Sequence, residues 1–181
     1  MSNVDKLRAS IIDPARTNQF RVTVTFPQAL NINGKQVEQA QVLARTVNIP
    51  EAEIGEIRMM KGGKPIKFAG DRDYGDVSID YRVDLNYAVH DLFLGWSDYI
   101  VSIGGFGANR SFQDYTADVV IEALRQDDSD TPIVTKEWIL RDVWPKNVSQ
   151  IDMDDDSENQ AVEFQITLAI KDYEYRTVST V

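Results

Sequence analysis

The sequence predicts a mostly β domain, an antiparallel β-sandwich or barrel-like fold with one packed α-helix. Two observations indicate this class. Apolar and polar residues alternate with a period of two along several segments, as in half-buried strands, whereas a helical period occurs once, in the middle of the chain. The predicted strands also follow one another without a helix between each pair, so the rhythm of a parallel βαβ sheet is missing.

Strand patterns extend along most of the chain. The clearest are Phe20 to Phe26, Val77 to Leu85 and Ala161 to Tyr173, each with one apolar and one polar face. Pro27, Pro50 and Pro145 are expected to stop strands, because proline cannot donate to a sheet. The predicted strands cover residues 20–26, 38–49, 53–60, 77–85, 115–124, 135–144 and 161–173, with a short extended piece at 66–68 and loops at 31–34 and 70–76.

A helix is expected at about 87–101. Apolar residues recur there at three- and four-residue spacing (Val89, Phe93, Trp96, Ile100), and Asn86 is the expected N-cap. The glycine-rich segment 103–107 ends this helix. We expect a single domain over 1–181, with an N-terminal arm at 1–19, a β core at 20–175 and a C-terminal tail at 176–181.

Composition excludes several function classes. The 181 residues include no cysteine and one histidine, so thiolate metal sites, disulfides, cysteine nucleophiles and multi-histidine sites are ruled out. With 19 Lys and Arg against 29 Asp and Glu, the formal net charge is −10, which argues against gripping a phosphate backbone. No apolar stretch reaches the length of a signal peptide or membrane span, and a chain made in the cytoplasm is expected.

The acidic segment 152–163 has the ligand spacing of a calcium loop. Its candidate ligands are Asp152, Asp154, Asp156, Glu158, Gln160 and Glu163. However, Ser157 takes the place where the loop needs glycine, and the flanking segments have strand patterns. A solvated acidic hairpin loop is therefore the favoured interpretation, and a calcium-binding β-sandwich module is the alternative.

A basic run crosses the middle of this acidic chain. Its members are Arg58, Lys61, Lys64, Lys67 and Arg72. The segment 61–65 lacks the residue order and following helix of a phosphate-binding loop. Two interpretations stay open, an ordinary solvated loop and a basic patch that meets an acidic surface of a partner.

His90 and the tryptophans are the remaining candidates for chemistry. An enzyme using His90 beside Asp91 would need a nucleophile motif that the sequence lacks. Trp96 lies on the apolar stripe of the helix, which indicates core packing, and Trp144 with Pro145 is expected at a packing corner. No catalytic residue, metal site or cofactor is predicted.

The polar strand faces suggest assembly. One helix covers one side of a sheet, so the other side must face water or a polar channel, and the strands at the edges need partners. A ring of identical subunits would satisfy both needs, with neighbours pairing the edges and polar faces lining a pore.

The sequence resembles the tail tube proteins of contractile-tailed bacteriophages from about Ala15 to about Tyr175. The resemblance is carried by the blocks 18–22, 66–72, 76–79, 93–96, 136–140, 143–148 and 162–169. Within these, Ala69-Gly70-Asp71-Arg72 and Trp144-Pro145-Lys146-Asn147-Val148 are fairly specific when they occur together in this order.

The resemblance implies a non-enzymatic structural protein of the virion tail, assembled in the host cytoplasm. It implies hexameric rings, forming a ring barrel on oligomerisation, that stack into a tube inside a contractile sheath. The implied partners are the sheath outside, a tape-measure protein and DNA in the lumen without specific binding, and the baseplate and tail terminator at the ends. The inner tube of a phage-derived injection particle or a type VI secretion particle is the alternative.

Strand alternation and charge segregation then assign residues to surfaces. The expected lumen residues are Ser78, Asp80, Arg82, Asp84, Glu163, Gln165 and Thr167. The expected subunit or ring contacts are Arg58, Lys61, Lys64, Lys67, Arg72, Asp127, Asp128, Asp154, Asp155 and Asp156. A lumen that carries net negative charge would let DNA slide without adhering.

Overall fold

A computed structural model describes residues 4, 15–101, 111–125, 132–154 and 160–178. The described elements are β1 (Phe20–Thr25), η1 (Gln28–Leu30), α2 (Gly34–Leu43), β2 (Ala44–Val47), β3 (Ala52–Lys61), β4 (Lys64–Tyr74), β5 (Val77–Arg82), α3 (Ala88–Ile100), α4 (Phe112–Tyr115), β6 (Ala117–Arg125), β7 (Ile133–Val148), β8 (Glu163–Ala169) and β9 (Asp172–Thr177). Across these ranges, none of the helices is long and apolar enough to span a bilayer.

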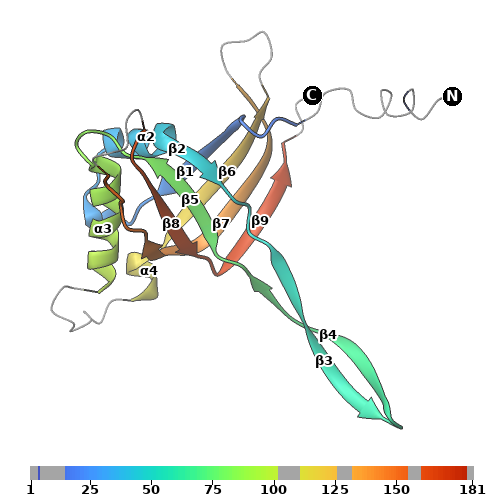
Figure 1. Cartoon of the computed structure of the whole chain (residues 1–181). Helices are drawn as coiled ribbons and strands as arrows, with labels where there is room; N and C mark the ends of the chain where they lie inside the picture. The colour runs from blue at the N-terminus through green and yellow to red at the C-terminus, as the bar shows by residue number, and fades with distance from the viewer. Residues whose placement is uncertain (1–3, 5–14, 102–110, 126–131, 155–159, 179–181) are drawn as a thin grey trace.

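The body is an antiparallel sandwich, which confirms the predicted fold class. Its seven strands have the order β1-β6-β7-β8-β5-β2, and β9 pairs with β7 beside that path. In Figure 1, β2, β5 and β8 lie in front of β1, β6 and β7, so the two halves of the sheet face each other. A second sheet contains β3 and β4 alone, and it projects from the body as a long twisted hairpin (Figure 1).

Strand β7 connects the two halves. Its first part, up to Arg141, lies between β6 and β9, and its last part, from Trp144, pairs with β8. Asp142 between them has φ of 52°, an uncommon left-handed backbone for a non-glycine residue, and the register with β8 shifts between Pro145 and Asn147. The predicted end of this strand at Trp144 is therefore wrong, because a bend lets the strand continue through Pro145 to Val148.

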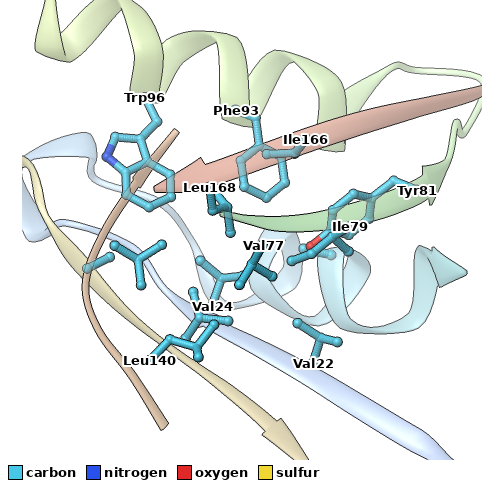
Figure 2. Packing of buried hydrophobic residues seen from close by; sticks show 14 of the residues in the cluster. Val22, Val24, Val77, Ile79, Tyr81, Phe93, Trp96, Leu140, Ile166 and Leu168 are labelled. Atoms are coloured by element: carbon cyan, nitrogen blue, oxygen red, sulfur yellow. The ribbon is translucent and has the colours of Figure 1, made fainter. Parts of the chain in front are cut away.

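Alternating residues from both halves form the core. The apolar faces of β1, β5, β6 and β8 meet there, and Val77, Ile79 and Ile166 are fully buried (Figure 2). Helix α3 closes the core at one end with Phe93 and Trp96 (Figure 2). This burial is the main stabilising term, because each large apolar side chain contributes about 1.5–3 kcal/mol when removed from water.

Aromatic side chains join α3 to the sandwich. Phe93 lies with its ring centroid 5.3 Å from Phe26 and 5.3 Å from Tyr81. Trp96 packs edge-on against Phe26 at 5.4 Å, and its indole Nε1 donates to the carbonyl oxygen of Tyr115 at 2.7 Å. The prediction that Trp96 belongs to the core is thus confirmed.

The helix at 87–101 is confirmed, although its start differs from the prediction. Tyr87, not Asn86, occupies the N-cap, with φ of 53°. The carboxylate of Asp84 accepts a hydrogen bond from the backbone N–H of Ala88 at 2.9 Å and so satisfies an N–H of the first turn. Strand β5 ends at Arg82, short of the predicted Leu85.

The predicted strand at 38–49 is wrong. Residues 34–43 form helix α2, and only Ala44–Val47 is a strand. Asn33 begins the helix with a capping box, in which its side chain accepts from the N–H of Gln36 at 3.0 Å and the Gln36 side chain accepts from its N–H. The body therefore has a second long helix, where the pattern predicted one helix.

Two further predictions need correction. The segment Gly70 to Asp76, predicted as a loop, lies mostly in β4, which begins at Lys64 and so also replaces the short piece at 66–68. The predicted last strand is two strands, β8 and β9, because Ile170 and Lys171 between them are not in strand conformation. Strand β9 ends at Thr177, past the expected start of the tail at 176.

Within the described residues, the Tyr81 hydroxyl has no hydrogen-bond partner, although its side chain is fully buried. Burial raises the pKa of this phenol, so the group stays neutral. We expect Tyr81→Phe to leave stability unchanged or to raise it by up to about 1 kcal/mol, because a desolvated hydroxyl without a partner is removed. Urea unfolding of both chains measures this.

Tyr175→Phe is the matched control, because that side chain is 67% exposed and should not change the unfolding midpoint. A clear loss of stability in Tyr81→Phe alone would contradict the assignment of an unsatisfied hydroxyl.

Candidate assembly surfaces

The outer face of β2, β5 and β8 is a continuous polar surface. Cross-strand pairing sets Thr46 beside Asp80 and Asp80 beside Gln165. The Asp80 carboxylate accepts from the Thr46 hydroxyl and from Gln165 Nε2 at 2.8 Å, so one row of side chains is hydrogen-bonded across three strands. Ser78 and Thr167 form the neighbouring pair on the same face.

The remaining lumen candidates lie at one end of this face. Arg82 pairs with Glu163 in the strand register, and the Glu163 carboxylate accepts from Arg45 of the neighbouring β2. Asp84 lies beyond the end of β5, where its carboxylate is engaged with the start of α3. The structure thus brings six of the seven predicted residues onto one strand face, while Arg45, which the sequence analysis missed, offsets part of its negative charge.

The other half of the sandwich has a row of charges on its outer face. Register pairing aligns Arg21, Glu122, Glu137 and Arg176 across β1, β6, β7 and β9. Arg21 Nε donates to Glu122 at 2.5 Å, and Arg176 Nε donates to Glu137 at 2.5 Å. The bond to Glu122 raises the pKa of Arg21. Each arginine therefore offsets one of two glutamates that face each other, which would otherwise repel.

The β3–β4 hairpin is almost entirely exposed. Its ten-residue first strand has no buried residue. Gly55 and Gly70 face each other where the register shifts between Ile54 and Glu56, and a Cβ on Gly70 would lie 3.0 Å from the carbonyl oxygen of Gly55. At the base, the ring of Tyr74 lies 4.9 Å from that of Tyr173 at the start of β9. The hairpin thus packs on the body at its base, and among the described residues it is exposed along most of its length.

The two faces of the hairpin differ. One face carries the cross-strand pairs Ile57 with Phe68 and Met59 with Ile66, followed by Lys61 with Lys64 near the turn. The four apolar side chains are each about half exposed. A contiguous exposed apolar surface of this kind indicates a binding site. The alternation of apolar and polar residues on this hairpin is visible in the sequence. The full length of the hairpin was not predicted, because residues 70–76 were assigned to a loop.

The predicted basic contacts all lie on this hairpin. Arg58 and Lys67 share Glu56 on the second face, with Lys67 Nζ at 2.8 Å from its carboxylate. No carboxylate of the described chain forms an ion pair with Lys61 or Lys64 near the turn. Arg72 lies near the base, opposite Ile54, and a hydrogen bond with Tyr74 raises its pKa.

The acidic candidates are only partly described. Asp127, Asp128, Asp155 and Asp156 lie outside the described residues, as does Glu158 of the calcium-spaced segment. Asp152, Asp154 and Gln160 are exposed. Glu163, at the last ligand position, lies in β8 and pairs with Arg45. The parts of the chain that the structure describes include no group of three potential metal ligands.

His90 and the remaining tryptophans serve packing. The imidazole of His90 meets the ring of Phe164 edge-on at 5.1 Å, and its Nδ1 is 3.9 Å from the Asp91 carboxylate. Trp138 is half-buried beneath Lys136, whose Nζ lies 5.1 Å from the indole centroid. Trp144 is half-buried at the bend of β7.

Comparison with known proteins agrees with this architecture. The model of the family described as phage tail tube protein matches residues 15–176. The chain belongs to the phage tail tube protein family. Its members are structural proteins, and the resemblance noted in the sequence is confirmed.

Relatives of this tail tube chain cover most of its length. It is 30% identical over 153 residues to the tail tube protein of Serratia phage KSP90, covering 84% of each chain. It is 25% identical to tail tube protein gp19 of Enterobacteria phage T4, covering 90% of this chain and 92% of the relative.

Solved structures share the fold at lower identity. A chain in the sheath-tube complex of the extracellular contractile injection system PVC in its extended state has a TM-score of 0.65 and 14% identity, covering 98% of this chain and 99% of the other. A chain in the six-fold symmetrised baseplate of the anti-feeding prophage has a TM-score of 0.64 and 17% identity, covering 93% and 99%.

Gly70→Ala tests the packing of the hairpin. We expect the added Cβ, 3.0 Å from the Gly55 oxygen, to push the two strands apart and to change amide chemical shifts across 52–74. Because the hairpin adds nothing to the core, the free energy of unfolding of the variant should stay within about 0.5 kcal/mol of the parent value. Two-dimensional NMR and urea unfolding measure the two effects.

Gly34→Ala is the control, since its Cβ would meet nothing within 4 Å. Chemical-shift changes of Gly70→Ala that spread through β5 and β8 would show that the hairpin is coupled to the body after all.

Proposed function

We propose that this chain is the structural, non-enzymatic subunit of the inner tail tube of a contractile-tailed phage, with six copies in a ring and rings stacked into a hollow conduit. The match to the tail tube family over 15–176 carries the proposal. The six-fold symmetry of the anti-feeding prophage baseplate, which holds a chain of the same fold, supports rings of six.

The described strands support assembly. Within the described residues, β1 pairs only with β6, β2 only with β5, and β9 only with β7, so each has an edge of backbone groups without a strand partner. Free edges are matched to a partner strand in a stable protein or are otherwise protected from aggregation. Neighbouring copies in a ring are the partners that we propose for them, which would form the ring barrel.

The outer face of β2, β5 and β8 is our proposed lumen surface. Ser78, Asp80, Arg82, Glu163, Gln165 and Thr167 line it, and Asp84 lies at its margin. Its carboxylates are bonded to neighbours, and its positive charge is limited to arginines beside those carboxylates. Such a surface offers a passing phosphate backbone no excess of cations to bind.

The proposed partners follow from this arrangement. A sheath would surround the tube, a tape-measure protein and then DNA would occupy the lumen, and a baseplate and terminator would cap the ends. The hairpin, with Arg58, Lys61, Lys64, Lys67 and Arg72, and the acidic residues Asp127, Asp128, Asp154, Asp155 and Asp156 are the proposed contacts between subunits or rings. We propose that assembly takes place in the host cytoplasm and that the mature protein resides in the virion tail.

The fold match to a sheath-tube complex of the PVC injection system favours one second candidate, the tube of a phage-derived injection particle. In such a particle the lumen would hold a protein cargo. The nucleic acid or protein content of purified particles separates the two functions.

Electron microscopy tests the proposal directly. Concentrated protein in negative stain should form rings with six-fold symmetry or tubes with a stain-filled channel. A monomer without rings at millimolar concentration and with a baseplate present as nucleus would refute the tube assignment.

Ser78→Lys with Thr167→Lys tests the lumen surface. Both substitutions add cations at positions whose side chains lie side by side on the proposed lumen face. We expect tubes of normal dimensions but slower release of DNA from the phage, with the rate recovering as salt is raised, since each lysine adds a phosphate contact.

Ser78→Glu with Thr167→Glu is the control for size and should release DNA at the parental rate. If the lysine variant released DNA normally but formed no rings, the face would be a subunit contact rather than a lumen wall.

A further inference from the structure

We propose that Asn33, at the start of helix α2, is a site of self-modification. The backbone nitrogen of Gly34 displaces the side-chain amide of Asn33 as ammonia, and water converts the product to aspartate or isoaspartate at position 33. The reaction needs water and no enzyme. It does not depend on the proposed function, because it takes place within a single copy of the chain.

The sequence provides the first condition for this chemistry. Asn33 is the only asparagine of the chain that is followed by glycine. A side chain on the following residue would hinder the approach of its backbone nitrogen to the asparagine side chain. Gly34 has none, and a Cβ added there would meet nothing within 4 Å. Asn33 and Gly34 are both exposed, so water reaches the site.

The attacking nitrogen has no hydrogen bond to break. Gly34 is the first residue of α2, and the N–H groups of a first helical turn have no acceptor within the helix. The Asn33 side chain accepts from the N–H of Gln36 at 3.0 Å rather than from Gly34. Across the described residues, no other group accepts from the Gly34 N–H. This nitrogen can therefore lose its proton to solvent directly.

The capping box activates the carbon that is attacked. The Gln36 N–H donates to Asn33 Oδ1, which polarises the side-chain carbonyl. The same N–H would stabilise the negative charge that forms on Oδ1 when the nitrogen adds to Cγ. The leaving group, Asn33 Nδ2, has no hydrogen-bond partner in the described part of the chain. Residues 33–36 thus bring together the attacking nitrogen, the carbonyl carbon and a donor for the developing charge.

The steps balance without any redox partner. A bond forms between Cγ of Asn33 and the nitrogen of Gly34, the bond from Cγ to Nδ2 breaks, and Nδ2 takes up a proton and leaves as ammonia. The product is a cyclic imide. Water opens this ring at Cγ to give aspartate, or at the main-chain carbonyl carbon to give isoaspartate, in which the chain continues through Cγ. Holding the two groups on adjacent residues makes the first step intramolecular.

The two products differ in their effect on α2, which lies at one end of the sandwich (Figure 1). Aspartate keeps an oxygen that accepts from Gln36, and its negative charge is favourable at a helix N-terminus. Isoaspartate adds a carbon to the main chain at the N-cap and so breaks the capping box. Ala40 is buried and Gln41 donates to the Thr23 hydroxyl at 2.8 Å, so the later part of α2 should stay in place.

Peptide mass spectrometry of protein stored at body temperature in mildly alkaline buffer tests the site. We expect the mass change of an amide replaced by a carboxyl group to accumulate at Asn33. Asn31 is the matched internal control, because it is also exposed and lies in the same tryptic peptide, 22–35. Conversion at Asn31 should be at least about tenfold slower, since the β-branched Ile32 follows it.

Gly34→Ala should slow the conversion of Asn33 about tenfold, because its methyl group hinders the attacking nitrogen. Labelling with an isoaspartyl methyltransferase and radioactive S-adenosylmethionine should mark the stored parent but neither Gly34→Ala nor Asn33→Asp. Amide hydrogen exchange at Gln36 and Val37 should be faster in the labelled fraction than in Asn33→Asp, with β5 unchanged.

Equal conversion at Asn31 and Asn33, or an unaltered Asn33 in the stored parent, would overturn the inference. Conversion that Gly34→Ala leaves at the parental rate would also contradict it, because direct hydrolysis of the side chain does not use the Gly34 nitrogen. These results do not bear on the formation of rings or tubes, so failure of this inference and failure of the proposed function are distinguishable.

Discussion

The fold depends on one strand that belongs to both halves of the sandwich. Strand β7 pairs with β6 and β9 up to Arg141, and after Asp142 it pairs with β8, apart from Val143, which lies opposite Ala117 of β6. The left-handed backbone at Asp142 and the shift after Pro145 turn the sheet so that its two apolar faces meet. Without that turn, the alternating residues of β5 and β8 would face water, and α3 would have no second layer to cover.

This bend also determines which strand faces are buried in the core and which are exposed. The inward faces of both halves are buried in the core, and the outward faces are polar. One outward face has a row of hydrogen-bonded side chains, and the other has a row of arginines and glutamates. The chain between β2 and β5 leaves the body as the hairpin, and its apolar residues therefore stay outside the core. The core residues and the residues that we propose as assembly contacts are therefore different.

The elements that could be predicted from the sequence are those with one face buried in the core. Strands with one buried face, such as β5 and β8, and the apolar stripe of α3 were found because a period of two or of about 3.6 follows directly from packing against one core. Helix α2 was missed because Ala40 is its only buried residue among those described, so its helical period is weak and its start depends on the Asn33–Gln36 capping box. The length of β4 was missed because Arg72 and Asp73 pair with β3 in an exposed ribbon, where neither face is buried. The row from Arg21 to Arg176 could not be predicted, since it depends on the register of four strands distant in sequence.

The separation of hairpin from core has a consequence for how such chains diversify. A substitution at the hairpin tip should change the stability of the fold little, because the side chains at the tip are exposed and do not pack on the body. If the hairpin is a contact between subunits, as we propose, paired changes at its tip and on the surface that it meets in a neighbouring copy can accumulate in one lineage. Subunits from two lineages in the same host would then assemble into separate tubes instead of mixing.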